Sequence, residues 1–427
     1  MSIKSLEAVC VTPENIQRMQ ISFDDSTGLI LDVGQLGIPS AKLDYIYNDD
    51  CYLFAGMGDV HIHAREDLSG KNTYKETFQS ASMAALNGGV IHCCDMPNNP
   101  IAPVDDESYK AKMILAANAP ISLFMYAGIG PETNPLSFRV PYKAYMGPSI
   151  GELFFKDHMT LDIALERYKG LDVSFHCEDP DVLEKNKNED SHCARRPVEA
   201  EVLATHQALE LIKRYNLKGK LCHYSSGEGL DAIRAFRNNG HQVEIEVTPQ
   251  HLYFNQSQIA KSESHWFQMN PPIREKMDQE AMLDAFIKGE IEYLATDHAP
   301  HTIDEKRKGT SGMPGLDTYG VLVGWLINEI KVDPKILART CSRNPGRFVS
   351  RFLEQWKSID PRFNALGSGF GELKKGYSAS FSVINLKKPV TIDNFNMKTK
   401  VKWNPFNGIS FSSSVEAVFL NGKYANL

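Results

Sequence analysis

Short apolar runs alternate with amphipathic stretches through the middle of this chain, from residue 52 to about residue 300. The apolar runs predict strands over 52–60, 89–94, 121–126, 141–146, 171–176, 219–224, 242–247 and 291–296. The amphipathic stretches predict helices over 75–86, 106–117, 160–168, 197–214, 227–238 and 278–288. Eight strands that alternate with helices over roughly 250 residues are typical of a (β/α)8 TIM barrel, although a doubly wound open sheet shares the alternation.

The two flanks of the chain have a different pattern. Residues 1–51 and 372–427 contain short alternating stretches and many turn residues. Asn421-Gly422 follows one such stretch, and Asn-Gly between alternating apolar residues is a hairpin signal. We therefore expect one small β-sandwich-like domain built from both termini, with the barrel over 52–371.

Composition and charge exclude several partners. The 427 residues carry a net charge of −7, and the lysines and arginines are scattered among acidic residues, so we expect no nucleic-acid surface. The first residues lack the apolar core of a signal peptide, and no apolar stretch is long enough to span a bilayer. The eight cysteines include one adjacent pair and no Cys-x-x-Cys motif, which favours reduced, mostly buried thiols in a cytoplasmic protein.

His61 and His63 close the first predicted strand as a His-x-His pair. Side chains on a strand alternate between its two faces, so two imidazoles at this spacing can converge on one ion. Further candidate ligands follow on other predicted strands, whose carboxyl ends form the functional face of a barrel. A single buried His or Asp often only satisfies backbone groups, but a shared position predicts a metal centre. These further candidates are Lys143, His176, His223 and Asp297.

Together with several motifs, these residues resemble the amidohydrolase superfamily, and within it the dihydroorotases of the longer, type I-like sort. The similarity runs from about residue 52 to residue 350, and residues 403–408 resemble the C-terminal β segment of that family. Any one motif is unspecific, whereas their combination is specific. The matching segments are 59–66, 96–99, 270–274, 295–302 and 313–316.

The resemblance implies a binuclear metal centre. Four histidines and a carboxylate favour zinc among the divalent ions. Lys143, carboxylated on its side-chain nitrogen, would bridge the two ions, because a buried lysine loses its charge readily and its neutral amine can add carbon dioxide. Lys156 is also near, but residues 142–146 resemble the lysine-bearing strand of the family. A bridging hydroxide would attack the ring amide, with Asp297 as general acid and base. The implied ligands are His61, His63, Lys143, His176, His223 and Asp297.

Substrate choice depends most on Arg65, because a guanidinium can bind a carboxylate through two parallel hydrogen bonds. Dihydroorotate and N-carbamoyl-aspartate carry such a carboxylate, whereas simple hydantoins and dihydropyrimidines do not. The alternative for Arg65 is a salt bridge with Glu66 or Asp67. By resemblance, the carboxylate is held by Arg65, Asn98 and His301, and the ring amide by Asn270 and the backbone at Pro314 and Gly315.

Several of these assignments have simpler alternatives. Asn98 fits a turn after a proline, and His301 fits a cap on the following loop. We interpret His92 as a core residue and His298 as a residue behind the site, and we assign no role to two other histidines, His192 and His251. Two segments depart from the family pattern: 67–70, where Pro-Gly is usual, and Ser149-Ile150, where a mobile lid often presents a threonine.

The implied reaction is the reversible cyclisation of N-carbamoyl-L-aspartate to L-dihydroorotate in pyrimidine synthesis. A sister enzyme such as a hydantoinase, dihydropyrimidinase or allantoinase is the alternative from the same superfamily. A catalytically dead subunit that serves as a scaffold is the alternative from another class, although such proteins typically lose metal ligands. We expect a small-molecule substrate and a homodimer, and an association with aspartate carbamoyltransferase stays open.

Overall fold

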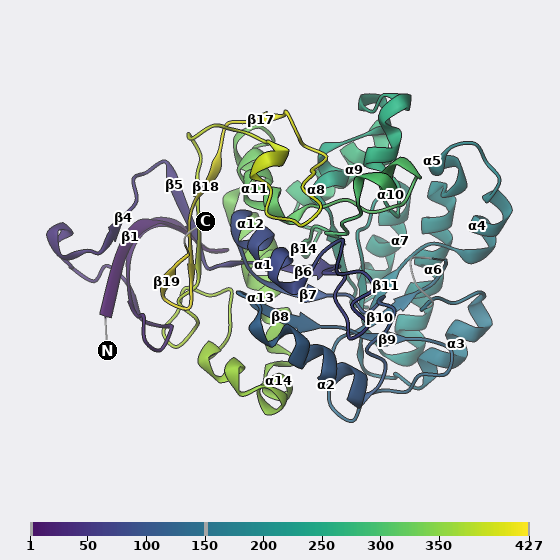
Figure 1. Cartoon of the computed structure of the whole chain (residues 1–427), viewed down its shortest axis with the longest axis horizontal. Coiled ribbons are helices and arrows are strands. Elements are labelled where there is room, and N and C mark those ends of the chain that lie inside the picture. The colour runs from purple at the N-terminus through teal and green to yellow at the C-terminus, as the bar shows by residue number, and fades with distance from the viewer. Residues whose placement is uncertain (1–2, 149–152, 426–427) are drawn as a thin grey trace.

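The computed structural model describes residues 3–148 and 153–425, and Ser149 and Ile150 lie outside these ranges. A (β/α)8 barrel forms the larger part of the protein, and a β-sheet formed by both ends of the chain lies beside it (Figure 1). The purple N-terminal strands and the yellow C-terminal strands lie next to each other in this sheet. This confirms the fold class that the sequence pattern predicts.

The barrel strands are parallel and follow one another in chain order. The third strand is interrupted at Tyr126, whose N–H donates to Asp95 on one side, while the next N–H, of Ala127, donates to Pro141 on the other. The His63 N–H donates to the His298 carbonyl at 2.7 Å and so joins the last strand to the first. The strands are β6 (Met57–Ile62), β7 (Val90–Asp95), β8 (Ser122–Met125), β9 (Ala127–Ile129), β10 (Tyr142–Tyr145), β11 (Asp172–His176), β12 (Lys218–Leu221), β13 (Glu244–Val247) and β14 (Tyr293–Leu294).

Helices surround the barrel, and each predicted helix is present. The helix over 227–238 has the predicted ends, and the other five differ from prediction by up to three residues. The first begins at Phe78 rather than at residue 75, because Thr77 accepts a hydrogen bond from the Ser80 N–H and acts as the N-cap. The helices are α1 (Phe78–Asn87), α2 (Asp106–Leu115), α3 (His158–Glu166), α4 (Pro180–Asn186), α5 (His192–Arg195), α6 (Val198–Tyr215), α7 (Gly227–Asn238), α8 (Pro249–Tyr253), α9 (Lys276–Ile287), α10 (Ile303–Arg307), α11 (Tyr319–Asn328), α12 (Pro334–Leu337), α13 (Asn344–Ser350) and α14 (Leu353–Ile359).

The terminal sheet is built from segments far apart in the chain. Its core contains Phe23, Phe381 and Phe419, whose rings pack edge to face. Ser382 joins the sheet to the barrel, because its hydroxyl accepts from the Met57 N–H and donates to the Gly89 carbonyl. The strands are β1 (Ile3–Val11), β2 (Ile16–Asp24), β3 (Leu29–Gly34), β4 (Tyr45–Ile46), β5 (Cys51–Phe54), β15 (Phe381–Asn385), β18 (Ser414–Leu420) and β19 (Lys423–Tyr424), and β16 (Val390–Thr391) pairs separately with β17 (Ser410–Phe411).

One strand prediction is wrong. The apolar run 52–60 forms two strands, because the chain turns at Gly56, which has a φ of +68° and lies against the Ser380 carbonyl. A Cβ at this position would stand 2.8 Å from that oxygen, so glycine is required. β5 consequently pairs in the terminal sheet and β6 in the barrel.

Two expectations concerned the state of the cysteines and membrane-spanning segments. The eight cysteines form no disulfide among the described residues, and all but Cys193 are buried. Within residues 3–148 and 153–425, no helix is both long enough and apolar enough to cross a membrane.

Candidate active site

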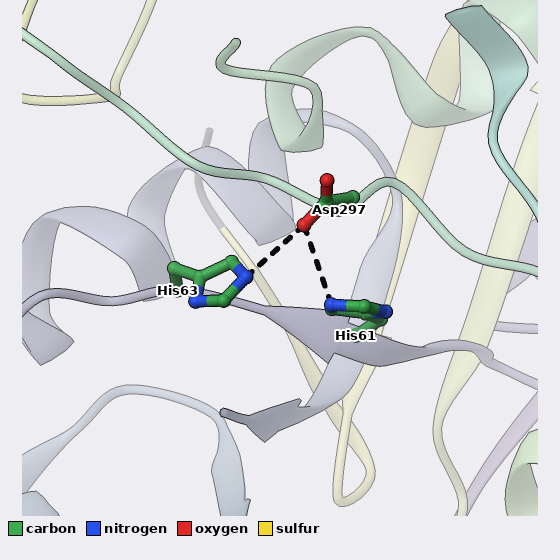
Figure 2. A group of neighbouring side chains, drawn as sticks. All are labelled: His61, His63 and Asp297. Carbon is green, nitrogen blue, oxygen red and sulfur yellow. Dashed lines mark ion pairs between the residues drawn. The ribbon is translucent and has the colours of Figure 1, made fainter. Parts of the chain in front are cut away.

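Three predicted site residues meet where the first and last barrel strands end. His61 lies on β6, His63 follows it directly, and Asp297 lies just beyond β14 (Figure 2). The Oδ1 atom of Asp297 is 3.3 Å from His61 Nε2 and 3.1 Å from His63 Nε2. All three side chains are buried, and the Asp297 carboxylate points between the two rings.

A second group of predicted residues lies beside the first. His176 ends β11, and its Nδ1 atom is 2.9 Å from Nε2 of His223, which lies just beyond β12. The His223 ring also lies 5.2 Å from the His61 ring, measured between centroids. Lys143, on β10, is fully buried, and in the described part of the chain its Nζ atom has no hydrogen-bond partner. Lys156 is exposed by contrast.

Burial keeps the four histidines neutral. It lowers the pKa of His61 to about 4, although the nearby Glu246 carboxylate raises it. Burial also lowers the pKa of His176, and it lowers those of His63 and His223 well below their ordinary values. A neutral imidazole offers a lone pair to a cation, as metal binding requires.

This donor set fits two divalent cations. His61, His63 and Asp297 form one group whose ligand atoms lie within 4.8 Å of one another, and His176 and His223 converge as a pair. Atoms bound to one ion at about 2 Å lie about 3 Å apart. The Asp297 oxygen lies 3.3 Å and 3.1 Å from the nitrogens of His61 and His63, and the nitrogens of His176 and His223 lie 2.9 Å apart. The amine of Lys143 is buried at the same site and, among the described residues, has no hydrogen-bond partner. It is therefore available to react or to bind a ligand.

Acidic and amide groups behind the rings fix their orientation. Glu246 binds His61 Nδ1 and Lys220 Nζ, and it accepts from the His223 N–H at 3.0 Å. Asn98 Oδ1 lies 2.7 Å from His63 Nδ1. The contacts of His61 and His63 through Nδ1 leave Nε2 of each ring facing the site, which is the usual arrangement around a bound metal.

His176 is held in the same way by Glu178. The Glu178 carboxylate is 2.7 Å from His176 Nε2, and it also binds Arg196. Burial alone would raise the pKa of Glu178, but Arg196 and His176 lower it to about 2, so the carboxylate is ionised. The sequence analysis did not identify Glu178 or Glu246.

Arg65 faces the pocket formed by these residues rather than a neighbouring acid. Glu66 accepts from the Phe78 N–H, and Asp67 accepts from the Ile101 N–H, so neither forms the salt bridge considered as an alternative. Arg65 is 3% exposed, and within the described ranges its Nε atom has no hydrogen-bond partner. One guanidinium nitrogen, NH2, lies 3.1 Å from His301 Nε2.

The rest of the pocket wall is only partly as predicted. Asn98 and Asn270 line it, as expected, together with Tyr145, Ser311 and Gly312. His301, Pro314 and Gly315 are not among the described residues that line it. His301 contacts Arg65 instead, and the Gly315 N–H donates to His298 Nδ1.

Histidines without a predicted role hold the segment around Asn270. His192 Nε2 lies 2.9 Å from the Met269 carbonyl, and His251 Nε2 lies 3.2 Å from the Pro271 carbonyl. His298 lies behind the site, in contact with Glu76, as the sequence predicted. His92 is a core residue that stacks on Phe370.

The C-terminal segment 397–403 binds residues behind the pocket. Trp403 Nε1 donates to the His301 carbonyl at 2.7 Å. The Lys400 N–H and the Thr399 hydroxyl both donate to Glu76, the partner of His298.

Comparisons with known proteins agree with this geometry. No protein-family model matches the chain. A dihydroorotase from Archaeoglobus fulgidus is 30% identical over 383 residues, which cover 86% of this chain and 85% of that protein. The dihydroorotase of Thermococcus kodakarensis is 28% identical over 399 residues, or 92% of this chain and 88% of that protein. This chain belongs to the dihydroorotase family.

Solved structures of hydantoinases have the same fold as this chain. An L-hydantoinase from Arthrobacter aurescens matches with a TM-score of 0.85 at 19% identity, over 99% of this chain and 96% of that one. A D-hydantoinase matches with a TM-score of 0.81 at 22% identity, over 99% and 95%. At these identities the likeness shows the fold alone. As a member of the dihydroorotase family, within the amidohydrolase superfamily, the chain is a cyclic amidohydrolase.

Proposed function

We propose that the protein is a dihydroorotase, which converts N-carbamoyl-L-aspartate to L-dihydroorotate and back. The supporting observation is Arg65, a buried guanidinium that lines the pocket and, among the described residues, has no hydrogen-bonded acid. Burial lowers the pKa of Arg65, although Asp297 and Asp95 raise it. A buried charge without a paired counter-ion is costly, so this position favours an anionic ligand. The ring carboxylate of dihydroorotate supplies that anion.

The residues proposed to hold metal divide into two groups. His61, His63 and Asp297 would hold one divalent ion, His176 and His223 would hold the other, and Lys143, once carboxylated, would bridge them. When bound, such ions polarise an amide carbonyl and lower the pKa of water. Asp297 moves the proton: its carboxylate takes it from the attacking water and gives it to the ring nitrogen that leaves. In ring closure the same carboxylate takes a proton from the carbamoyl nitrogen.

The substrate-binding residues orient the ring for this transfer. Arg65, Asn98 and His301 are proposed to hold the carboxylate on one side of the pocket. Asn270 is proposed to hold the ring amide on the other side, because its Oδ1 atom is buried and, in the described part of the chain, has no hydrogen-bond partner. An amide N–H of the ring can donate to that oxygen.

We expect the purified, zinc-loaded protein to interconvert dihydroorotate and N-carbamoyl-aspartate in both directions. Hydantoin, dihydrouracil and allantoin lack the ring carboxylate, so their kcat/KM should be lower by about a hundredfold or more. A steady-state assay of all four rings across a pH series measures this difference. Equal or better turnover of a ring without the carboxylate would contradict the assignment, and no turnover by metal-loaded protein would favour the scaffold alternative.

Glu246→Gln is expected to weaken zinc binding by about 10- to 100-fold. The amide keeps the size of the side chain but loses the charge that orients His61 and pairs with Lys220. A competition titration with a chelator measures the affinity of the full-length protein. Glu228→Gln, an exposed change of the same kind on α7, is the control. Equal affinities of the two variants would show that Glu246 does not support the site.

A further inference from the structure

Lys75 is a buried cation beside the proposed carboxylate site. It is 8% exposed, and its Nζ atom lies 3.3 Å from His301 Nδ1 and 2.8 Å from Glu305 Oε1. Lys75 does not itself line the pocket formed by the described residues. It contacts His301 from one side, while Arg65 contacts the same ring from the other.

Lys75 is fixed in this position by its neighbours. Thr77, two residues after Lys75, is the N-cap of α1. Glu76, which lies between them, binds the Lys400 N–H and His298. Burial opposes the ionisation of Glu305, but hydrogen bonds from Lys75 and from the Thr302 N–H lower the pKa of its carboxyl. The ion pair of Lys75 with an ionised Glu305 therefore keeps the ammonium against the ring.

The hydrogen-bonding capacity of these groups decides where His301 carries its proton. An ammonium has only donors, and a neutral imidazole has one N–H and one lone pair. The Arg65 guanidinium, 3.1 Å from Nε2, also has only donors, so the neutral ring cannot accept from both cations. When a carboxylate lies at Nε2 and accepts there, the proton belongs on Nε2 and the lone pair on Nδ1, where Lys75 donates. Burial and the charges of Arg65 and Lys75 lower the pKa of His301 far below its ordinary value, which keeps the ring neutral.

We propose that Lys75 is a positioning residue that fixes His301 as its Nε2–H tautomer, so that His301 and Arg65 both donate to one carboxylate of the substrate. Both donors then point at the same place, because His301 Nε2 and the Arg65 NH2 nitrogen lie 3.1 Å apart. A carboxylate oxygen accepts a hydrogen bond from each of them. It thereby separates two N–H donors that would otherwise point at each other. That the carboxylate belongs to dihydroorotate rests on the proposed function.

The opposite tautomer fits a bound carboxylate less well. It would place the Nδ1–H against the Lys75 ammonium, donor to donor, and its nearest acceptor would be Glu305 Oε2 at 3.6 Å. That distance is too long for a hydrogen bond. The opposite tautomer would also leave Nε2 as an acceptor, which repels a carboxylate.

Nitrogen NMR of the full-length protein with 15N-labelled histidine tests the tautomer directly. The His301 signals are assigned by their loss in His301→Gln. We expect a protonated Nε2 and an unprotonated Nδ1 in the complex with orotate, a planar ring that carries the same carboxylate. In the Lys75→Met complex, part of the population should move to the Nδ1–H form. An Nδ1–H form in the orotate complex of the unaltered protein would overturn the proposal.

Ligand binding supplies the second measurement. In zinc-loaded protein, Lys75→Met should weaken orotate binding by about 10- to 100-fold and leave the binding of uracil, which has no carboxylate, unchanged. For dihydroorotate the loss should appear in KM, with kcat changed by less than about threefold, and Lys75→Arg should recover most of it. Lys71→Met, an exposed change in the same segment, is the matched control.

The outcomes separate this proposal from the proposed function. Equal orotate affinity in Lys75→Met and Lys71→Met, or equal losses for orotate and uracil, would overturn the role of Lys75. If the unaltered protein neither binds orotate nor turns over dihydroorotate, the proposed function fails. The role of Lys75 then fails with it, whereas a failure of the role of Lys75 alone leaves orotate binding and dihydroorotate turnover in the unaltered protein.

Discussion

Replacing Asp297 with asparagine is expected to lower kcat for dihydroorotate by about 10³- to 10⁴-fold, in both directions of the reaction. The carboxylate points between His61 and His63, where it can both bind an ion and carry a proton. Burial raises its pKa, although His61 and Lys143 lower it, and a higher pKa makes the carboxylate a better base. An asparagine amide keeps the shape but cannot accept the proton.

The zinc content must be measured together with kcat, because Asp297 is proposed both to bind an ion and to carry the proton. Asp304→Asn, an exposed change on α10, should leave rate and zinc content unaltered. A fully zinc-loaded Asp297→Asn protein with kcat within tenfold of the original would mean that another group carries the proton.

Arg65→Met should lower kcat/KM for dihydroorotate by about 10²- to 10³-fold, since a carboxylate loses two charge-assisted hydrogen bonds. Most of the loss should be in KM, as measured by steady-state kinetics in the ring-opening direction. Zinc content should stay the same, because the guanidinium contacts His301 rather than the proposed metal-binding rings.

Two further variants check this interpretation. Arg65→Lys keeps the charge without the forked geometry and should recover only part of the loss. Arg307→Met, an exposed change on α10, should behave as the original protein. Normal turnover of dihydroorotate by Arg65→Met would remove the main support for the substrate assignment.

The sequence was sufficient to predict the barrel, because strands buried on both faces and amphipathic helices leave distinct patterns. It was not sufficient at Gly56, where the chain leaves one sheet and enters another within a single apolar run. Periodicity cannot show such a turn, since both strands are buried. β9 was missed for a similar reason, because three residues after a one-residue break look like the end of the preceding strand.

The proposed ligand residues were predictable because each lies on a barrel strand or shortly after its end. The groups that orient them were not, because their contacts join residues distant in sequence. Glu246 is 185 residues from His61, and Lys75 is 226 residues from His301. One usable signal was present: Glu246 is an acidic residue in an otherwise apolar strand end, a position that requires a buried partner.

The segment 397–403 has a consequence for biosynthesis. Every residue proposed to bind metal is translated before Trp403, whose indole holds the His301 carbonyl. Arg65, Asn98 and His301 are also translated before it, so a nascent chain carries these residues before the support for His301 is made. Ribosome-bound chains that end before residue 397 are therefore expected to take up zinc but to hold orotate poorly, so that competence for substrate is the last property the polypeptide gains.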